Sequence, residues 1–159
     1  MIGGRVLDST ALVAFATGRP VYVRALVWAA VKANIVLAVP SAALGRAWSI
    51  LAPEHHAAPG VLLDLPITVI DQLDPRAAQE SGMLLAAAGT DDLSAGQVAL
   101  SARRRGWPAV PGEPWYLRKL DATVTIEELP SRRRRPTALP PSVTRVRICD
   151  GASARQPPT

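Results

Sequence analysis

The sequence predicts an α/β protein built as three layers, α/β/α, with helices on both faces of a mostly parallel central sheet. Short aliphatic and β-branched runs alternate along the chain with longer segments of helical spacing, which is the order that parallel sheets require. The 159 residues are 48% hydrophobic but only 4% aromatic, a composition that fits aliphatic helices packed on a sheet of Val, Ile and Leu. This length accommodates one domain and a tail.

The first expected strand and helix meet at an aspartate. The apolar run that begins the chain ends at Asp8, and helical spacing follows over residues 9–17. Ser9 or Thr10 is the expected N-cap of this helix, and Gly18 is its expected stop.

The same alternation continues to residue 51. Residues 20–34 have helical spacing, residues 35–40 form a buried type of strand that ends at a proline, and residues 41–51 form a helix that Ser41 is expected to cap. Each of these helices carries a tryptophan within an apolar pattern, so we expect two tryptophans in the core: Trp28 and Trp48.

The second half of the body repeats the pattern after a loop at residues 53–60. A helix is expected between Asp74 as its cap and Gly89 beyond its end, and another over residues 93–105 that Gly106 stops. The remaining elements are strands over 66–73, 107–111 and 122–129 and a short helix over 113–120.

The positive charge of the chain is concentrated at its C-terminal end. From Ser131 onward, seven arginines face one acid and give +6, whereas the body carries 11 basic and 12 acidic residues and gives −1. Six of the fifteen prolines lie from Pro130 onward, so we expect a folded domain over 1–130 and a disordered basic tail over 131–159. The run Arg132, Arg133, Arg134 and Arg135 either contacts RNA or another polyanion or is solvated without a specific partner.

Composition also argues against membrane insertion and secretion. Charged residues or prolines interrupt each apolar run before it reaches spanning length. Asp8 lies where a signal peptide would be apolar, and Cys149 is a single cysteine. We therefore expect a cytoplasmic protein with no membrane partner.

Three acidic residues recur where an expected strand or loop leads into a helix. Asp8 follows the first strand, Asp92 opens the helix over 93–105, and Glu113 follows a short strand through a Pro-Gly turn. In a parallel sheet such positions meet at one edge, and like charges about 4 Å apart repel by roughly 4 kcal/mol at an effective dielectric near 20. Such a cluster needs a cation or protons, and oxygen ligands suit Mg²⁺ or Mn²⁺. The alternative for Asp92, and for its neighbour Asp91, is helix capping alone.

Four blocks of the body occur in the order and spacing of one known fold. The blocks "VLDSTALVAF", "VPSAALGRAW", "DDLSAGQVALSARRRGWPAV" and "PGEPWYLRKLDATVTIEEL" together resemble a PIN domain, the nuclease fold of many bacterial toxin–antitoxin ribonucleases. The resemblance spans residues 3–129 and leaves the tail without a counterpart. It implies an endoribonuclease that uses four acids and one or two ions of Mg²⁺ or Mn²⁺, with RNA as substrate. It also implies an antitoxin protein as partner, and members of this family often form homodimers.

Residue by residue, the resemblance places three of the family's four acids on this chain. They fall on Asp8, Asp92 and Glu113 as catalytic and metal-binding positions, and the family's glutamate in the second block falls on Arg46. This departure changes the formal charge of the four positions from −4 to −2. A guanidinium there can bond to Asp8 or Asp92 and supply the countercharge that a metal would give, while Asp91 is expected to start the helix. We therefore expect weakened metal binding and reduced nuclease activity, with a catalytically inactive protein- or RNA-binding module as the alternative.

Other residues and one other fold are also candidates for a functional role. Trp115 and Tyr116 either stack an RNA base at the rim of the site or pack in the core, and exposure decides between the two. The adjacent His55 and His56 lack the spacing and the cysteine partners of a zinc site. A phosphoacceptor receiver fold would need an acidic pair after the first strand, where Asp8 stands alone.

Overall fold

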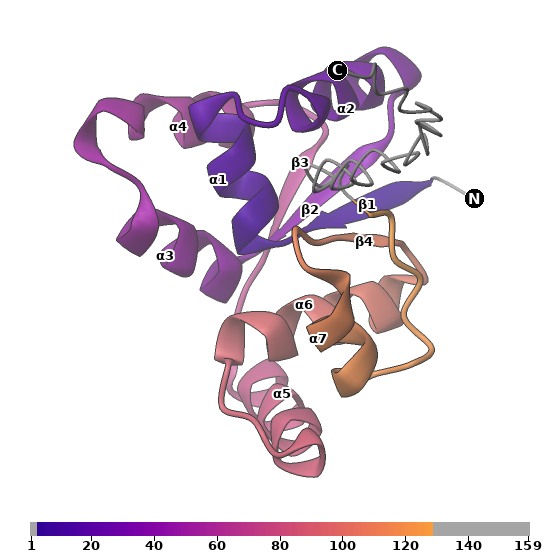
Figure 1. The fold of residues 1–159 in the computed structure, drawn as a ribbon. Helices are drawn as coiled ribbons and strands as arrows, with labels where there is room; N and C mark the ends of the chain where they lie inside the picture. The colour runs from indigo at the N-terminus through magenta and orange to yellow at the C-terminus, as the bar shows by residue number, and fades with distance from the viewer. Residues whose placement is uncertain (1–2, 129–159) are drawn as a thin grey trace, which may run out of the picture.

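Four parallel strands form the centre of the molecule, and helices cover both faces of this sheet (Figure 1). This computed structural model describes residues 3–128. The strand order is β3-β2-β1-β4, with bounds β1 Gly4–Leu7, β2 Val36–Pro40, β3 Thr68–Asp71 and β4 Ala109–Val110. The predicted three-layer α/β/α fold is confirmed.

The pairing of the strands brings the ends of β1 and β4 side by side. Val6 pairs with Ala109 and Leu7 with Val110, and both pairs are fully buried. Because the strands are parallel, the residues that follow them emerge at the same edge of the sheet. The start of helix α1 (Ser9–Thr17) and the loop before helix α7 (Pro114–Leu120) therefore lie next to each other.

The helices divide between the two faces of the sheet, with α1, α2 and α4 on one side of the ribbon and α5, α6 and α7 on the other (Figure 1). Their bounds are α1 Ser9–Thr17, α2 Tyr22–Ala33, α3 Ser41–Ile50, α4 Ala57–Leu63, α5 Pro75–Ala88, α6 Leu93–Arg105 and α7 Pro114–Leu120, with a 3₁₀ turn η1 at Pro53–His55. One core cluster joins the sheet to α1, α2 and α4, and a second joins it to α6 and α7. Helix α3 contributes to both, through Ala47 to the first and Ala43 to the second.

Several helix ends follow the predicted residues closely. Asp74 caps α5 and accepts a hydrogen bond of 2.7 Å from the backbone N–H of Ala77. Gly89 ends α5 and Gly106 ends α6, each with a positive φ that an L side chain rarely adopts. No helix among residues 3–128 is long and apolar enough to span a bilayer.

Three capping assignments were wrong. The N-cap of α1 is Asp8 rather than Ser9 or Thr10, and the N-cap of α6 is Asp92 rather than Asp91. Ser41 makes no capping bond, because its hydroxyl accepts a bond of 2.9 Å from the backbone N–H of Leu73, beyond β3. A contact between distant segments has replaced the local one.

The prediction that two tryptophans lie in the core was also wrong. Trp28 is 62% exposed and Trp48 is 38% exposed. The buried stripe of α2 runs through smaller residues, Val23, Leu26, Val27 and Ala30, and leaves Trp28 beside it. The Lys32 ammonium lies over the Trp28 ring, 3.7 Å from its centroid.

Two further segments differ from prediction. The expected strand over 122–129 is reduced, within the described residues, to one parallel bridge between Ile126 and Ala109. β4 contains only two residues, so it offers little edge for pairing. The expected loop at 53–60 contains η1 and the start of α4. The predicted tail over 131–159 lies outside the described residues.

Candidate functional site

The carboxylate of Asp8 is the buried centre of the site. Asp8 follows β1, begins α1 and is only 1% exposed. One oxygen accepts bonds from the backbone N–H of Ser9 at 2.5 Å and from its hydroxyl at 3.1 Å. The other accepts bonds from the hydroxyls of Thr10, at 2.8 Å, and Tyr116. Protein donors thus satisfy both oxygens of a carboxylate that is almost out of contact with water.

Thr10 connects this centre to the loop after β4. While its hydroxyl donates to Asp8, it accepts a bond of 2.6 Å from the backbone N–H of Gly112. A Cβ on Gly112 would lie 2.9 Å from the Thr10 side chain, so a residue without a side chain permits this approach. The contact positions Glu113 and the start of α7 at the edge of the sheet.

Tyr116 lies on α7, and its hydroxyl donates a hydrogen bond to Asp8. Burial raises the pKa of the Tyr116 hydroxyl strongly, and the nearby charge of Asp8 and its hydrogen bond raise it further. The hydroxyl therefore stays protonated and remains a donor to Asp8. The sequence pattern does not reveal this contact, although Tyr116 follows Glu113 by three residues and so shares its neighbourhood.

Asp92 combines the two roles that the sequence had divided between neighbouring aspartates. One of its oxygens caps α6 by accepting a bond of 3.2 Å from the backbone N–H of Ala95. The other lies 2.5 Å from Nη1 of Arg46, on α3. The Arg46 side chain is 49% exposed and that of Asp92 is 31% exposed, so this ion pair lies at the rim.

Glu113 is the most peripheral of the three predicted acids. It is exposed, precedes α7, and its carboxylate accepts a bond of 3.3 Å from the indole N–H of Trp115.

These side chains surround one cavity of about 410 Å³ at the edge of the sheet. It is lined by Ser9, Thr10, Arg46, Thr90, Asp92, Ala95, Glu113, Trp115, Tyr116, Lys119 and Leu120. Asp8 lies behind it, bonded to three of the lining residues, Ser9, Thr10 and Tyr116. The positions that the sequence singled out thus meet around one hollow.

The donor set of this cavity does not fit a divalent cation. Within residues 3–128, no three His, Cys, Asp or Glu side chains gather in a way that could hold a metal ion. Asp8 is already bonded to protein donors, and Asp92 faces a guanidinium, which repels a cation. The arrangement supplies two hydrogen-bonded acids, an internal positive charge and an exposed aromatic rim.

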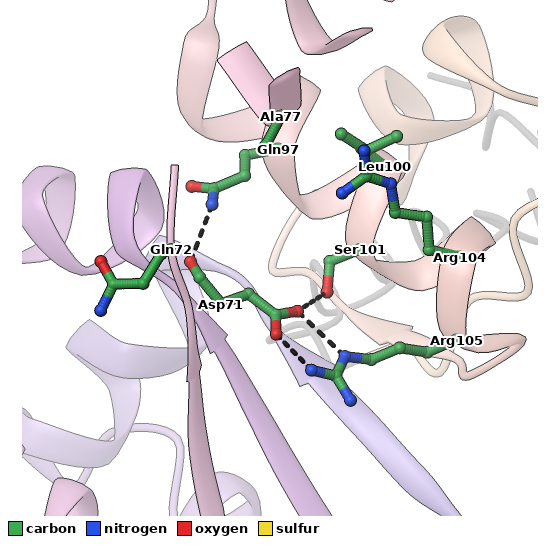
Figure 2. A pocket seen from close by; sticks show the side chains of 8 residues that line it. All are labelled: Asp71, Gln72, Ala77, Gln97, Leu100, Ser101, Arg104 and Arg105. Atoms are coloured by element: carbon green, nitrogen blue, oxygen red, sulfur yellow. Dashed lines mark hydrogen bonds and ion pairs between the residues drawn. The ribbon is translucent and has the colours of Figure 1, made fainter. Parts of the chain in front are cut away.

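A second polar cluster lies at the end of β3, beside a smaller cavity of about 210 Å³ (Figure 2). The Asp71 carboxylate accepts bonds from the hydroxyl of Ser101 and the guanidinium of Arg105. Burial would raise the pKa of Asp71, but the bonds from Arg105 and Ser101 outweigh it and leave that pKa lowered. The buried side chain of Gln97 bonds to the carbonyl of Asp71 and to the N–H of Ala42, each at 2.8 Å. This cluster fastens α6 to β3 and to the start of α3.

The three arginines at the end of α6 are all engaged with acids. Arg103 pairs with Asp121 at 3.6 Å, Arg104 with Glu80 at 2.8 Å, and Arg105 with Asp71. Three consecutive residues therefore connect the end of one helix to three other segments.

Comparison with known proteins finds a similar fold but no match by sequence. No protein-family model matches the chain, and no curated protein matches it. A chain in the crystal structure of VapBC2 from Rickettsia felis bound to a DNA fragment from their promoter matches with a TM-score of 0.58 and 15% identity. The match covers 79% of the present chain and 98% of the other. At this identity the likeness concerns the fold alone, and it agrees with the three-layer α/β/α architecture of the chain.

Proposed function

We propose that this chain is a PIN-like RNA-binding protein whose acidic centre holds its own cation in place of a metal ion and does not cleave RNA. The observation that carries this proposal is the ion pair of 2.5 Å between Arg46 and Asp92. Four acids at these positions would carry −4, whereas Asp8, Asp92, Glu113 and Arg46 together carry −2.

A metal ion would have to disrupt the contacts already present in the centre. It would compete with Arg46 for Asp92 and with Tyr116 for Asp8. The half-exposed Arg46–Asp92 pair contributes little to the free energy of unfolding. The positive charge of the Arg46 guanidinium nevertheless opposes a divalent cation at the Asp92 carboxylate. Mg²⁺ also needs near-octahedral oxygen ligands and loses its water reluctantly. These requirements favour a binding role over hydrolysis.

RNA is the ligand class that the chain supports best. The PIN-like fold is the fold of the ribonucleases that the sequence resembles, and residues 131–159 carry +6. The cavity places Arg46 and Lys119 beside an exposed tryptophan, a combination that suits phosphate and base. A protein partner of the antitoxin type is the second candidate, because the fold neighbour was solved as VapBC2.

The test is an RNA assay with two readouts. Full-length protein is incubated with end-labelled single-stranded RNA in Mg²⁺, in Mn²⁺ and in EDTA. Shortening of the labelled RNA measures cleavage, and fluorescence anisotropy measures binding. We expect RNA binding that EDTA does not reduce, and no cleavage above that of the Asp8→Asn variant. Metal-dependent cleavage by the wild type that Asp8→Asn abolishes would establish an active ribonuclease instead, with circular dichroism to show that the variant is folded.

A further inference from the structure

We infer that Trp115 and Lys119 form a binding site for one unpaired nucleotide of an RNA strand, and that Glu113 holds the tryptophan in place. This inference rests on the proposed function, because it takes single-stranded RNA as the ligand. It gives Glu113 a positioning role rather than that of a metal ligand.

Exposure is the property that separates base stacking from core packing at this position. Trp115 is 66% exposed and lines the cavity, whereas its neighbour Tyr116 is turned inward and bonded to Asp8. An indole that is open to solvent at the rim of a cavity is available to stack on a base. Of the two aromatic residues, Trp115 is therefore the candidate platform.

Two contacts restrain this indole without covering it. Its N–H donates to Glu113 at 3.3 Å, and its ring meets that of Tyr116 edge to face, with centroids 6.1 Å apart and an interplanar angle of 84°. A ring that is already restrained loses less conformational freedom when a ligand binds. Glu113 thus acts on the ligand through Trp115.

Lys119 supplies the positive charge that a nucleotide phosphate needs. It lies four residues after Trp115 on α7, so both side chains leave the same face of the helix, and both line the cavity. Lys119 takes part in none of the ion pairs found among residues 3–128. The cavity volume of about 410 Å³ lies in the usual range of small-ligand sites, roughly 300 to 1,000 Å³.

Helix α2 provides a matched control with the same spacing of residues. Trp28 and Lys32 are also four residues apart, and Trp28 is also exposed, at 62%. There the ammonium lies over the ring, 3.7 Å from its centroid, and neither residue lines this cavity. A general effect of surface tryptophans would therefore appear at both helices, whereas a nucleotide site would appear only at α7.

The experiment measures the affinity of full-length protein for a fluorescein-labelled oligouridylate of eight nucleotides, by anisotropy in EDTA. We expect Trp115→Ala to weaken binding by about 5- to 150-fold, the range of one base–aromatic stack, and Trp115→Phe to restore most of it. Lys119→Gln should weaken binding and reduce the slope of log affinity against log salt by about 0.7, whereas Lys119→Arg should not. Trp28→Ala should match the wild type.

Two variants test the positioning role of Glu113. Glu113→Ala should weaken binding because it frees the indole, and Glu113→Gln should retain it because the amide oxygen still accepts the indole N–H. If both variants weaken binding equally, the positioning role is wrong.

The outcomes separate this inference from the proposed function. If the wild type binds RNA without cleaving it and Trp115→Ala binds equally well, the nucleotide site is wrong and the proposed function stands. If the wild type cleaves RNA while Trp115→Ala weakens binding in the Asp8→Asn background, the site stands and the non-catalytic assignment fails. If the wild type does not bind the oligonucleotide, both are wrong.

Discussion

Single hydrogen bonds decide the chemistry of the acidic centre. Asp8 is 1% exposed, so its oxygens depend on protein donors rather than on water for their hydrogen bonds. Among residues 3–128, Tyr116 is the one donor to Asp8 that comes from a distant part of the chain, because the other donors belong to Ser9 and Thr10. The tyrosine hydroxyl therefore joins α7 to the end of β1 as well as occupying a carboxylate oxygen.

Removing that hydroxyl should destabilise the fold measurably. We expect Tyr116→Phe to lower the free energy of unfolding by about 1–3 kcal/mol, because a buried charged acceptor loses its partner. Urea unfolding at neutral pH measures this loss. Tyr22→Phe is the control, since the Tyr22 hydroxyl bonds at 3.1 Å to Glu127, which is less buried than Asp8. A loss no greater than that of Tyr22→Phe would contradict the role assigned to Tyr116.

The two tyrosines of the chain should resist ionisation by alkali. Burial raises the pKa of both Tyr22 and Tyr116 above the usual 10.0, and each is raised further by the carboxylate that it contacts. A raised folded-state pKa gives stability that is fully present below pH 10.0 and is lost as the pH rises towards the folded value. Absorbance at the tyrosinate band should therefore rise only above pH 10.0, and the protein should unfold as the absorbance rises. Ionisation of both residues in the folded protein near the usual pKa would refute this.

At the scale of elements, α6 contributes both to the acidic centre and to the ion pairs that connect it with other segments. Its N-cap is Asp92, and its last turn holds Arg103, Arg104 and Arg105, each paired with an acid of another segment. Positive charges in a last turn also suit the negative end of the helix dipole. The ion pairs add contacts between elements, which no local pattern reveals.

The contacts of the Asp71 carboxylate with Ser101 and Arg105 contribute a stability that depends on pH. The pKa of Asp71 is lowered from its usual 3.8, so its contribution is present above that pH and is lost as the pH falls through the folded value. We expect Asp71→Asn to cost about 1–3 kcal/mol of unfolding free energy at pH 7 and progressively less as the pH falls below 3.8. Urea titrations across this range measure the difference. The exposed Asp91→Asn serves as control, and an Asp71→Asn effect that does not change with pH would contradict the assignment.

The sequence predicted elements well where local chemistry determines them. Asp74, Pro75 and Gly89 mark the ends of α5 through capping and φ preferences that operate within one turn. Local patterns fail where tertiary contacts decide. Ser41 bonds to Leu73 rather than capping its own helix, and the last predicted strand finds only a two-residue partner in β4.

Part of the geometry at this edge of the sheet was also predictable, from the topology of the sheet. Parallel strand ends bring Asp8 and the Glu113 loop together, so topology alone places them at one edge. The partner of Asp8 on α7 depends on how that short helix packs, and the periodicity of a helix does not reveal it. Likewise, the pattern of α2 identified a buried stripe but not that Trp28 lies outside it.

At the scale of the whole molecule, charge is divided between body and tail. Residues 1–130 carry −1 and residues 131–159 carry +6, so the chain is basic through its C-terminal end. The paired arginines of α6 add little free positive charge to the body. Non-specific attraction to RNA is therefore expected from the tail, and base contact from the cavity.

This division predicts a specific salt dependence. Replacing Arg132, Arg133, Arg134 and Arg135 with glutamine should reduce the slope of log affinity for single-stranded RNA against log salt by about 3. Replacement with lysine should leave the slope nearly unchanged. Anisotropy titrations at several salt concentrations measure it. An equal slope in the glutamine variant would mean that the arginine run has no part in RNA binding.

We propose that Arg46 takes the place of a metal ion in the acidic centre, and calorimetric titration with Mn²⁺ tests this proposal most directly. We predict no measurable binding of Mn²⁺ to the wild type and clear binding to Arg46→Glu, which restores −4 to the four positions. Arg46→Gln, which removes the positive charge without adding a ligand, should fall between them. Tight Mn²⁺ binding by the wild type that Asp8→Asn abolishes would contradict the claim.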